Sequence, residues 1–208
     1  MTREQDTWDD DYATRGRLWG GAPDVLPDLP AGARLLEMGC GSGKTFSALV
    51  SGGWNVVAFD FSPSAVKLCR RCVGSSASGY VATADARCLP FRDGVFDAVI
   101  AFHIIGHMVK HDRKRSIAEA ARVLRAGGSL FFRDFSSRDF RVGSGDETEC
   151  NTFCRGTGII THYFLESEVT DLFCAFHRVS FCTRPWTMRV RGKNLAREEV
   201  EVVFLKER

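Results

Sequence analysis

The chain has 208 residues and 44% hydrophobic content, which is enough for one domain with a full core and short for two. We therefore expect a single domain over residues 1–208. No apolar run reaches about 18 residues and the chain begins with a polar segment, so we expect neither a membrane span nor a signal peptide. Eight cysteines without an export signal indicate reduced thiols and a cytoplasmic location.

Short apolar runs alternate with helical patterns along the chain, which is typical of an α/β protein with a parallel sheet. We expect strands at 33–38, 55–60, 79–83, 96–102, 128–134, 177–183 and 199–206. Helices are expected at 44–52, 63–72, 113–125 and 166–174, with Ala126-Gly127-Gly128 ending the third of these as a glycine cap. Residues 1–30 are expected to form a further helix and a loop.

A glycine-rich turn follows the first expected strand. Glycines there let a ligand approach the backbone, and the helix start that follows favours anionic or polar groups. A phosphate-binding P-loop requires glycine where Met38 stands, and the dinucleotide fingerprint requires glycine where Lys44 stands. What remains is an acidic-x-Gly-x-Gly-x-Gly pattern formed by Glu37, Gly39, Gly41 and Gly43.

This pattern resembles motif I of the class I S-adenosylmethionine-dependent methyltransferases. The resemblance implies a Rossmann-like, seven-stranded, mostly parallel sheet with helices on both faces, and an N-terminal segment 1–30 that covers the cofactor edge. Asp60 ends the second expected strand and is suited to accept hydrogen bonds from the ribose hydroxyls, and Asp85 ends the third, at the adenine edge. The implied cofactor-binding residues are Glu37, Gly39, Cys40, Gly41, Gly43, Asp60, Phe61, Asp85, Ala86 and Phe102.

The second half of the chain carries a closer resemblance. Phe132-Arg133-Asp134, Arg155-Gly156-Thr157-Gly158 and Tyr163-Phe164 are similar to hallmarks of the methyltransferase-like family that forms 3-methylcytidine in tRNA. The resemblance implies methylation of a tRNA base, by this chain alone or with a helper protein. The acid that the family carries before Gly-Thr is missing here, and only about 33 residues precede the first strand, so the cofactor is better supported than the substrate.

Asp134, His103 and Arg133 are the candidate catalytic residues. Asp134 ends the fifth strand, where its carboxylate is suited to stabilise the cation that forms when a cytosine N3 is methylated. The alternative is that Asp134 pairs with Arg133 or Arg155 and only orders the loop. His103 is a candidate base or pocket wall, and either arginine suits a phosphate or the methionine carboxylate.

A basic segment lies near the C-terminus. It contains no acid and carries Arg178, Arg184, Arg189, Arg191, Lys193 and Arg197 around Trp186, a composition that suits phosphate contacts with one stacking platform. The alternative is a solvated face. The candidate substrate-binding residues are Arg155, Tyr163, Arg189 and Arg191.

No metal site is expected. His103, His107 and His111 are spaced as on one helix face, but Gly106 makes a continuous helix doubtful. The cysteine pairs Cys69/Cys72 and Cys150/Cys154 lack the paired zinc pattern. Three functional classes stay open: a methyltransferase acting on an RNA base, one acting on a small metabolite, and a non-catalytic cofactor-binding subunit or an ATPase that uses Gly43-Lys44-Thr45.

Overall fold

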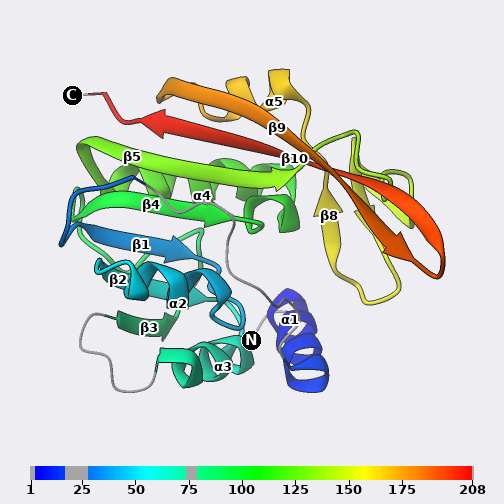
Figure 1. Cartoon of the computed structure of the whole chain (residues 1–208), viewed down its shortest axis with the longest axis horizontal. Coiled ribbons are helices and arrows are strands. Elements are labelled where there is room, and N and C mark those ends of the chain that lie inside the picture. The colour runs from blue at the N-terminus through cyan, green and yellow to red at the C-terminus, as the bar shows by residue number, and fades with distance from the viewer. Residues whose placement is uncertain (1–2, 17–27, 74–78, 208) are drawn as a thin grey trace.

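The computed structural model describes residues 3–16, 28–73 and 79–207. Within these ranges a seven-stranded sheet has the order β3-β2-β1-β4-β5-β10-β9 (Figure 1). Its strands are β1 (Arg34–Met38), β2 (Asn55–Asp60), β3 (Gly79–Thr83), β4 (Phe96–Phe102), β5 (Leu124–Phe135), β9 (His177–Val190) and β10 (Lys193–Leu205). The first five are parallel, whereas β10 is antiparallel to β5 and β9 is antiparallel to β10. The predicted Rossmann-like, mostly parallel sheet is confirmed.

Helices α2 (Lys44–Ser51) and α3 (Pro63–Val73) cover one face of this sheet, and α4 (Lys110–Val123) and α5 (Glu166–Leu172) cover the other. The described part of the chain also contains α1 (Arg3–Arg15) and the short 3-10 helix η1 (Ile105–His107). Because side chains alternate along a strand, Leu35 of β1 packs in the core layer under α2 and α3, while Leu36 and Met38 pack in the layer under α4 and α5. None of the described helices combines the length and the apolar character that a membrane crossing requires.

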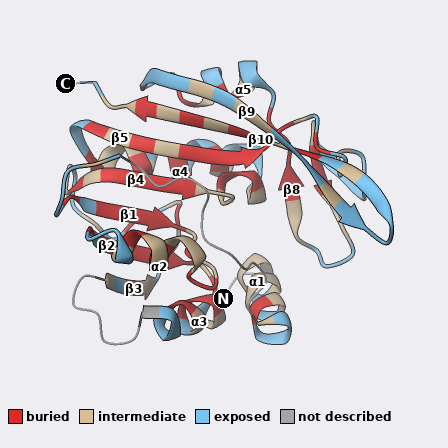
Figure 2. Cartoon of the chain, viewed as in Figure 1, coloured by how far each residue is buried: buried red, intermediate tan, exposed pale blue. Residues whose placement is uncertain are grey.

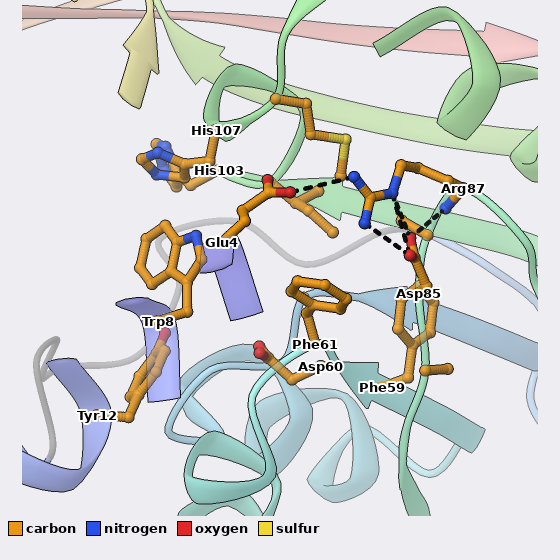
Figure 3. Close-up of a pocket in the computed structure, with 15 residues that line it drawn as sticks. Glu4, Trp8, Tyr12, Phe59, Asp60, Phe61, Asp85, Arg87, His103 and His107 are labelled. Carbon is orange, nitrogen blue, oxygen red and sulfur yellow. Dashed lines mark hydrogen bonds and ion pairs between the residues drawn. The ribbon is translucent and has the colours of Figure 1, made fainter. Parts of the chain in front are cut away.

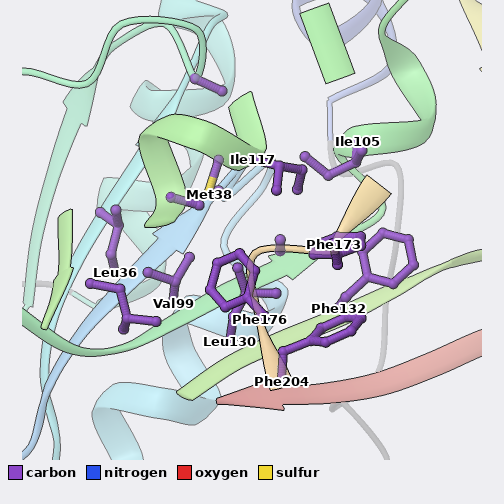
Figure 4. Close-up of a cluster of buried hydrophobic side chains, with 14 of the residues drawn as sticks. Leu36, Met38, Val99, Ile105, Ile117, Leu130, Phe132, Phe173, Phe176 and Phe204 are labelled. Atoms are coloured by element: carbon purple, nitrogen blue, oxygen red, sulfur yellow. The ribbon is translucent and has the colours of Figure 1, made fainter. Parts of the chain in front are cut away.

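Stacked phenylalanines join the C-terminal strand to the parallel part of the sheet (Figure 4). The rings of Phe173 and Phe204 lie 4.4 Å apart, and Phe173 also lies 4.9 Å from Phe132 of β5. All three side chains are buried, and removing one such ring typically costs about 3–5 kcal/mol. This packing holds the end of α5 against β5 and β10.

The carboxyl ends of β1, β2, β4 and β5 share one edge of the sheet, where doubly wound folds bind their ligands. Two further parts of the chain lie at this edge (Figure 1). One is helix α1. The other is a three-stranded sheet of β6 (Asp146–Glu149), β7 (Thr152–Cys154) and β8 (Ile160–His162).

The end of one predicted helix and the content of strands need correction. The helix predicted at 113–125 ends at Val123 without a glycine cap, because the buried Leu124 is already extended and begins β5. The three-stranded sheet was not predicted, since strands of three or four residues show too few alternations to be recognised. The helix predicted within residues 1–30 is α1, whereas most of the predicted loop falls on residues 17–27, outside the described part of the chain.

Strands β9 and β10 form a hairpin that is much longer than the two strands predicted at 177–183 and 199–206. Its turn has left-handed backbone at Arg191 (φ 47°) and Gly192 (φ 78°), the geometry of a two-residue hairpin turn. The distal half of the hairpin extends past the sheet and is largely exposed (Figure 2). It carries Arg189, Arg191 and Lys193 of the basic segment away from the core.

Candidate functional site

A pocket lies between α1 and the carboxyl ends of β1, β2 and β4 (Figure 3). Its lining residues are Glu4, Trp8, Tyr12, Gly39, Phe59, Asp60, Phe61, Ala84, Asp85, Ala86, Arg87, His103, Ile104, His107 and Met108. The pocket is therefore lined by α1 and by residues at or just after the ends of β1, β2, β3 and β4.

The glycine-rich turn forms the floor next to this pocket. A Cβ atom built on Gly39 would lie 3.0 Å from Ile104, and one on Gly41 would lie 2.7 Å from the Tyr12 hydroxyl, so a side chain at either position would force its neighbour to shift. Both residues also have left-handed backbone, with φ of 71° and 52°. Asp60 Oδ2 accepts a hydrogen bond of 2.8 Å from the Gly41 amide and thereby ties β2 to the turn.

Two buried carboxyl groups lie beside the turn with raised pKa values. Burial raises the pKa of Glu37 to about 8 and that of Asp60 to about 6. In the described part of the chain, Glu37 Oε2 is buried and has no hydrogen-bond partner. An orphaned carboxyl oxygen next to a second acid fits a ligand that carries positive charge, because a nearby cation stabilises both carboxylates.

At the opposite end of the pocket, Arg87 contacts Asp85 and Phe61. The Asp85 carboxylate receives hydrogen bonds from Arg87 Nη2 at 2.8 Å and Nε at 2.9 Å. Burial alone would raise the pKa of Asp85, but these bonds outweigh it and leave the pKa below its ordinary value. The Arg87 guanidinium also lies 5.3 Å from the centre of the Phe61 ring. This end thus offers an ionised acid beside an aromatic face.

His103, Asp134 and Glu199 form a charged cluster at the sheet edge. His103 Nε2 lies 3.2 Å from Glu199 Oε1, and His103 Nδ1 lies 3.8 Å from Asp134 Oδ1. Burial alone would lower the pKa of His103, but the two carboxylates raise it to about 9. Burial would likewise raise the pKa of Asp134, and the contact with His103 keeps it below its ordinary value. Two carboxylates around one imidazolium leave the cluster net negative at neutral pH.

Local backbone geometry fixes this cluster. Asp134 is fully buried and its Oδ2 accepts a hydrogen bond of 2.7 Å from the Gly106 amide. A Cβ atom on Gly106 would lie 2.8 Å from Asp134 Oδ1, so glycine is required for this approach. His103 itself has left-handed backbone (φ 54°), which is uncommon outside glycine and occurs preferentially at functional sites.

His107 and Trp8 form the wall next to His103. The two rings meet edge to face with centroids 4.9 Å apart. His107 Nδ1 lies 2.8 Å from the Ile160 carbonyl oxygen, which only accepts, so Nδ1 carries the proton and Nε2 keeps a lone pair. Burial lowers the pKa of His107, which is consequently neutral at pH 7. Because η1 and α4 are separate helices, His103, His107 and His111 do not share one helix face.

The structure places the predicted cofactor residues in two groups. Gly39, Asp60, Phe61, Asp85 and Ala86 line the pocket. Glu37, Cys40, Gly41 and Gly43 belong to β1 and the turn beneath it, and Phe102 lies at the end of β4, 4.5 Å below the Arg133 guanidinium. The sequence analysis expected residues 1–30 to cover the cofactor edge, but it did not list Glu4, Trp8 and Tyr12 of this segment as site residues, and it did not anticipate Arg87.

The predicted arginines lie outside the pocket lining. Arg133 pairs with Glu201 at 2.8 Å, and Arg155 donates to the hydroxyl of the buried Tyr163 at 3.1 Å. The alternative in which Asp134 pairs with Arg133 or Arg155 is therefore wrong, since both guanidinium groups bind elsewhere.

The basic segment is only partly available for a ligand. Arg178 pairs with Glu166, Arg184 with Glu201, and the buried Arg197 with Asp139. The other three basic residues are exposed around the tip of the hairpin and are Arg189, Arg191 and Lys193. The hairpin tip is therefore the part of the segment that is suited to phosphate contacts, whereas the arginines outside the tip pair with carboxylates of this chain.

Comparisons with known proteins point to one family. A family model described as a methyltransferase domain matches residues 36–132. A solved structure of an S-adenosylmethionine-dependent methyltransferase from Methanosarcina mazei is 25% identical, has a TM-score of 0.72, and covers 89% of this chain and 99% of its own.

Two curated relatives differ in what they methylate. The chain is 29% identical to the tRNA N(3)-cytidine methyltransferase METTL2 of Gallus gallus, over 71% of this chain and 43% of that protein. It is 35% identical to the demethylmenaquinone methyltransferase of Clavibacter sepedonicus, over 58% of this chain and 49% of that protein. The chain spans less than half the length of both relatives.

Proposed function

The chain belongs to the class I S-adenosylmethionine-dependent methyltransferases, and we propose that it methylates a base nitrogen in RNA, of the cytidine N3 type. The cofactor supplies an electrophilic methyl group on a sulfonium, so this chain's own residues have to position the acceptor and match the charge that develops on it.

The pocket supports one orientation of S-adenosylmethionine. Phe61 and Asp85 would hold the adenine, and Asp60 would accept from the ribose hydroxyls. The methionine end would then lie at Gly39 and Gly41, beside the orphaned oxygen of Glu37. The cationic groups of the cofactor suit the two acids with raised pKa values, so the residues present fit this cofactor.

The charged cluster of His103, Asp134 and Glu199 is the observation that carries the choice of acceptor. A cytosine N3 attacks as a neutral lone pair and becomes cationic, so carboxylates nearby stabilise the transition state more than the ground state. The cluster is net negative, the Gly106 amide donates to Asp134, and Glu199 contacts His103. With a pKa of about 9, His103 is protonated at neutral pH, and its role is to donate a hydrogen bond and not to act as a base.

Exposed cations support RNA as the larger substrate. Arg189, Arg191 and Lys193 lie around the tip of a hairpin that extends past the site edge of the sheet, where they would contact phosphates. The similarity to a tRNA N(3)-cytidine methyltransferase agrees with this assignment. Because the chain spans 43% of that relative, we propose that tRNA is bound either directly or with a helper protein.

A second candidate, methylation of a small phenol-like acceptor, is favoured by His107. Its neutral ring keeps a lone pair on Nε2 at the pocket wall, which suits the removal of a phenolic proton. The similarity to a demethylmenaquinone methyltransferase is in line with this alternative. Methylation of a phenol requires a base to remove the phenolic proton, whereas methylation of the cytidine N3 does not.

Mass spectrometry of nucleosides from total tRNA, incubated with the protein and S-adenosylmethionine, tests the proposal. We expect 3-methylcytidine, and we expect the matched variant Asp134→Asn to form it much more slowly. Labelled methyl transfer to a demethylated quinol, with no transfer to tRNA in the presence of cell extract as a source of helper protein, would instead establish the second candidate. In that case His107→Gln would abolish the transfer.

A further inference from the structure

Arg87 joins helix α1 to Asp85, a residue that lines the pocket. Its Nη1 lies 3.1 Å from Glu4 Oε2 of α1 and 2.9 Å from Asp112 Oδ2 of α4. Its Nη2 lies 2.8 Å from Asp85 Oδ2. One guanidinium thus contacts three carboxylates from three segments, and the Glu4–Arg87–Asp85 chain crosses the pocket from α1 to the loop after β3 (Figure 3).

Helix α1 is held over the pocket mainly by polar contacts. Gln5 Nε2 donates to the Phe61 carbonyl oxygen at 2.8 Å. Asp9 Oδ1 accepts from Ser62 Oγ and the Ser64 amide, both at 2.7 Å, and thereby caps the first turn of α3. Among residues 4–15, Tyr12 alone is buried. With so little apolar burial, the closed position of α1 depends on its polar links.

We propose that Arg87 is a positioning residue that couples α1 to Asp85, so that α1 stays closed over S-adenosylmethionine while the Glu4–Arg87–Asp85 chain is intact. Arg87 approaches Asp85 through Nε and Nη2, which fixes the carboxylate, and each oxygen keeps lone-pair capacity for the adenine amine. The same guanidinium lies over Phe61. It therefore orders both groups that would contact the adenine.

The coupling follows from where α1 lies. Glu4, Trp8 and Tyr12 line the pocket from α1, so a movement of α1 away from the sheet would open the pocket and speed the release of a bound cofactor. Moving α1 breaks the contact between Glu4 and Arg87, and this frees Arg87 to release Asp85. The inference concerns the cofactor and goes beyond the choice of acceptor, so it holds for either methyl acceptor.

Release of S-adenosylhomocysteine, followed by stopped-flow competition with unlabelled ligand, tests the coupling. We expect Glu4→Gln to speed release about threefold and Arg87→Met about tenfold, and we expect high salt to weaken the Glu4 effect. Asp6→Asn removes the same charge from an exposed position of α1 and is the matched control, with release unchanged. The double variant should release no faster than Arg87→Met, because Glu4 acts only through Arg87.

Amide hydrogen exchange of residues 3–15 gives a second readout that does not depend on activity. With bound S-adenosylhomocysteine, protection of α1 should fall in Glu4→Gln and in Arg87→Met, and Arg87→Lys should restore less than half of it, because lysine lacks the fork that binds Asp85 and Glu4 together. Glu4→Gln keeps the test valid if Arg87→Met proves unstable. Unchanged release and unchanged protection in Glu4→Gln, or additive effects in the double variant, would overturn the proposal.

Discussion

His103 Nε2 lies 3.2 Å from Glu199 Oε1, which joins the end of β4 to the returning strand β10. Together with Asp134, Glu199 keeps the imidazole protonated at neutral pH. The antiparallel strand of the sheet thus supplies an acid to a site that is otherwise built from parallel strands.

Glu199→Gln should lower the pKa of His103 from about 9 toward its ordinary value. Because the folded pKa is raised, the pair stabilises the protein fully below about pH 6.5 and loses this effect as the pH rises through about 9. His103 is about one third exposed, so we expect a loss of only about 0.5–1 kcal/mol at pH 6. Titration by NMR and urea unfolding at pH 6 and pH 10 check both points. An unchanged His103 pKa would show that Asp134 acts alone.

Glu37→Gln should make the cofactor-free protein more stable at pH 8.5. The folded pKa of about 8 exceeds the usual value of 4.5, so Glu37 favours folding below pH 4.5, and that contribution is lost as the pH rises toward 8. We expect a gain of roughly 1–3 kcal/mol at pH 8.5 and little change at pH 4.5. Urea unfolding at the two pH values measures it. The same variant should bind S-adenosylhomocysteine more weakly, which calorimetry detects, because the amide cannot become a carboxylate beside the ligand's ammonium group.

Asp134→Asn should slow methyl transfer by about 10²-fold or more and leave tRNA affinity nearly unchanged, since its proposed role is confined to the transition state. Gly106→Ala offers an independent route to the same effect. The added Cβ would lie 2.8 Å from Asp134 Oδ1 and would displace the carboxylate. Single-turnover rates and filter-binding affinities separate the two quantities. A variant that loses tRNA affinity and keeps its single-turnover rate would contradict this role.

Arg189→Ala and Arg191→Gly should weaken tRNA binding and reduce the magnitude of its salt slope by about 0.7–0.9 for each phosphate that is no longer neutralised. Glycine is chosen at position 191 because the backbone there is left-handed. Arg178→Ala is the control, because Arg178 already pairs with Glu166. Affinity is measured at salt concentrations from about 50 to 300 mM. About equal losses of affinity in all three variants would argue against the hairpin tip as the RNA-binding surface.

Local patterns explain why the cofactor half of the fold was predictable. Glu37 and the glycines after it occur at short spacings that suit the turn that the structure contains, and Asp60 and Asp85 follow apolar runs that mark strand ends. Five of the residues predicted from them line the pocket, and their contacts with the cofactor remain predictions.

The rest of the site depends on contacts between distant segments. Glu199 reaches His103 only because β10 returns antiparallel beside β5, with Glu199 opposite Phe135. Arg87 becomes important only when α1 folds back and brings Glu4 to it. No local periodicity encodes either arrangement, and the short strands β6–β8 gave no pattern above that of a loop.

The position of α1 decides at which end of the chain a tag or fluorophore can be attached. The first turn of this helix places Glu4 at the pocket mouth, whereas β10 ends at the opposite edge of the sheet, where Lys206 Nζ donates to the carbonyl oxygens of Ala121 and Leu124 (Figure 1). An affinity tag or fluorophore attached ahead of α1 would therefore emerge beside the cofactor and compete with it for space. One attached after β10 would leave the site clear.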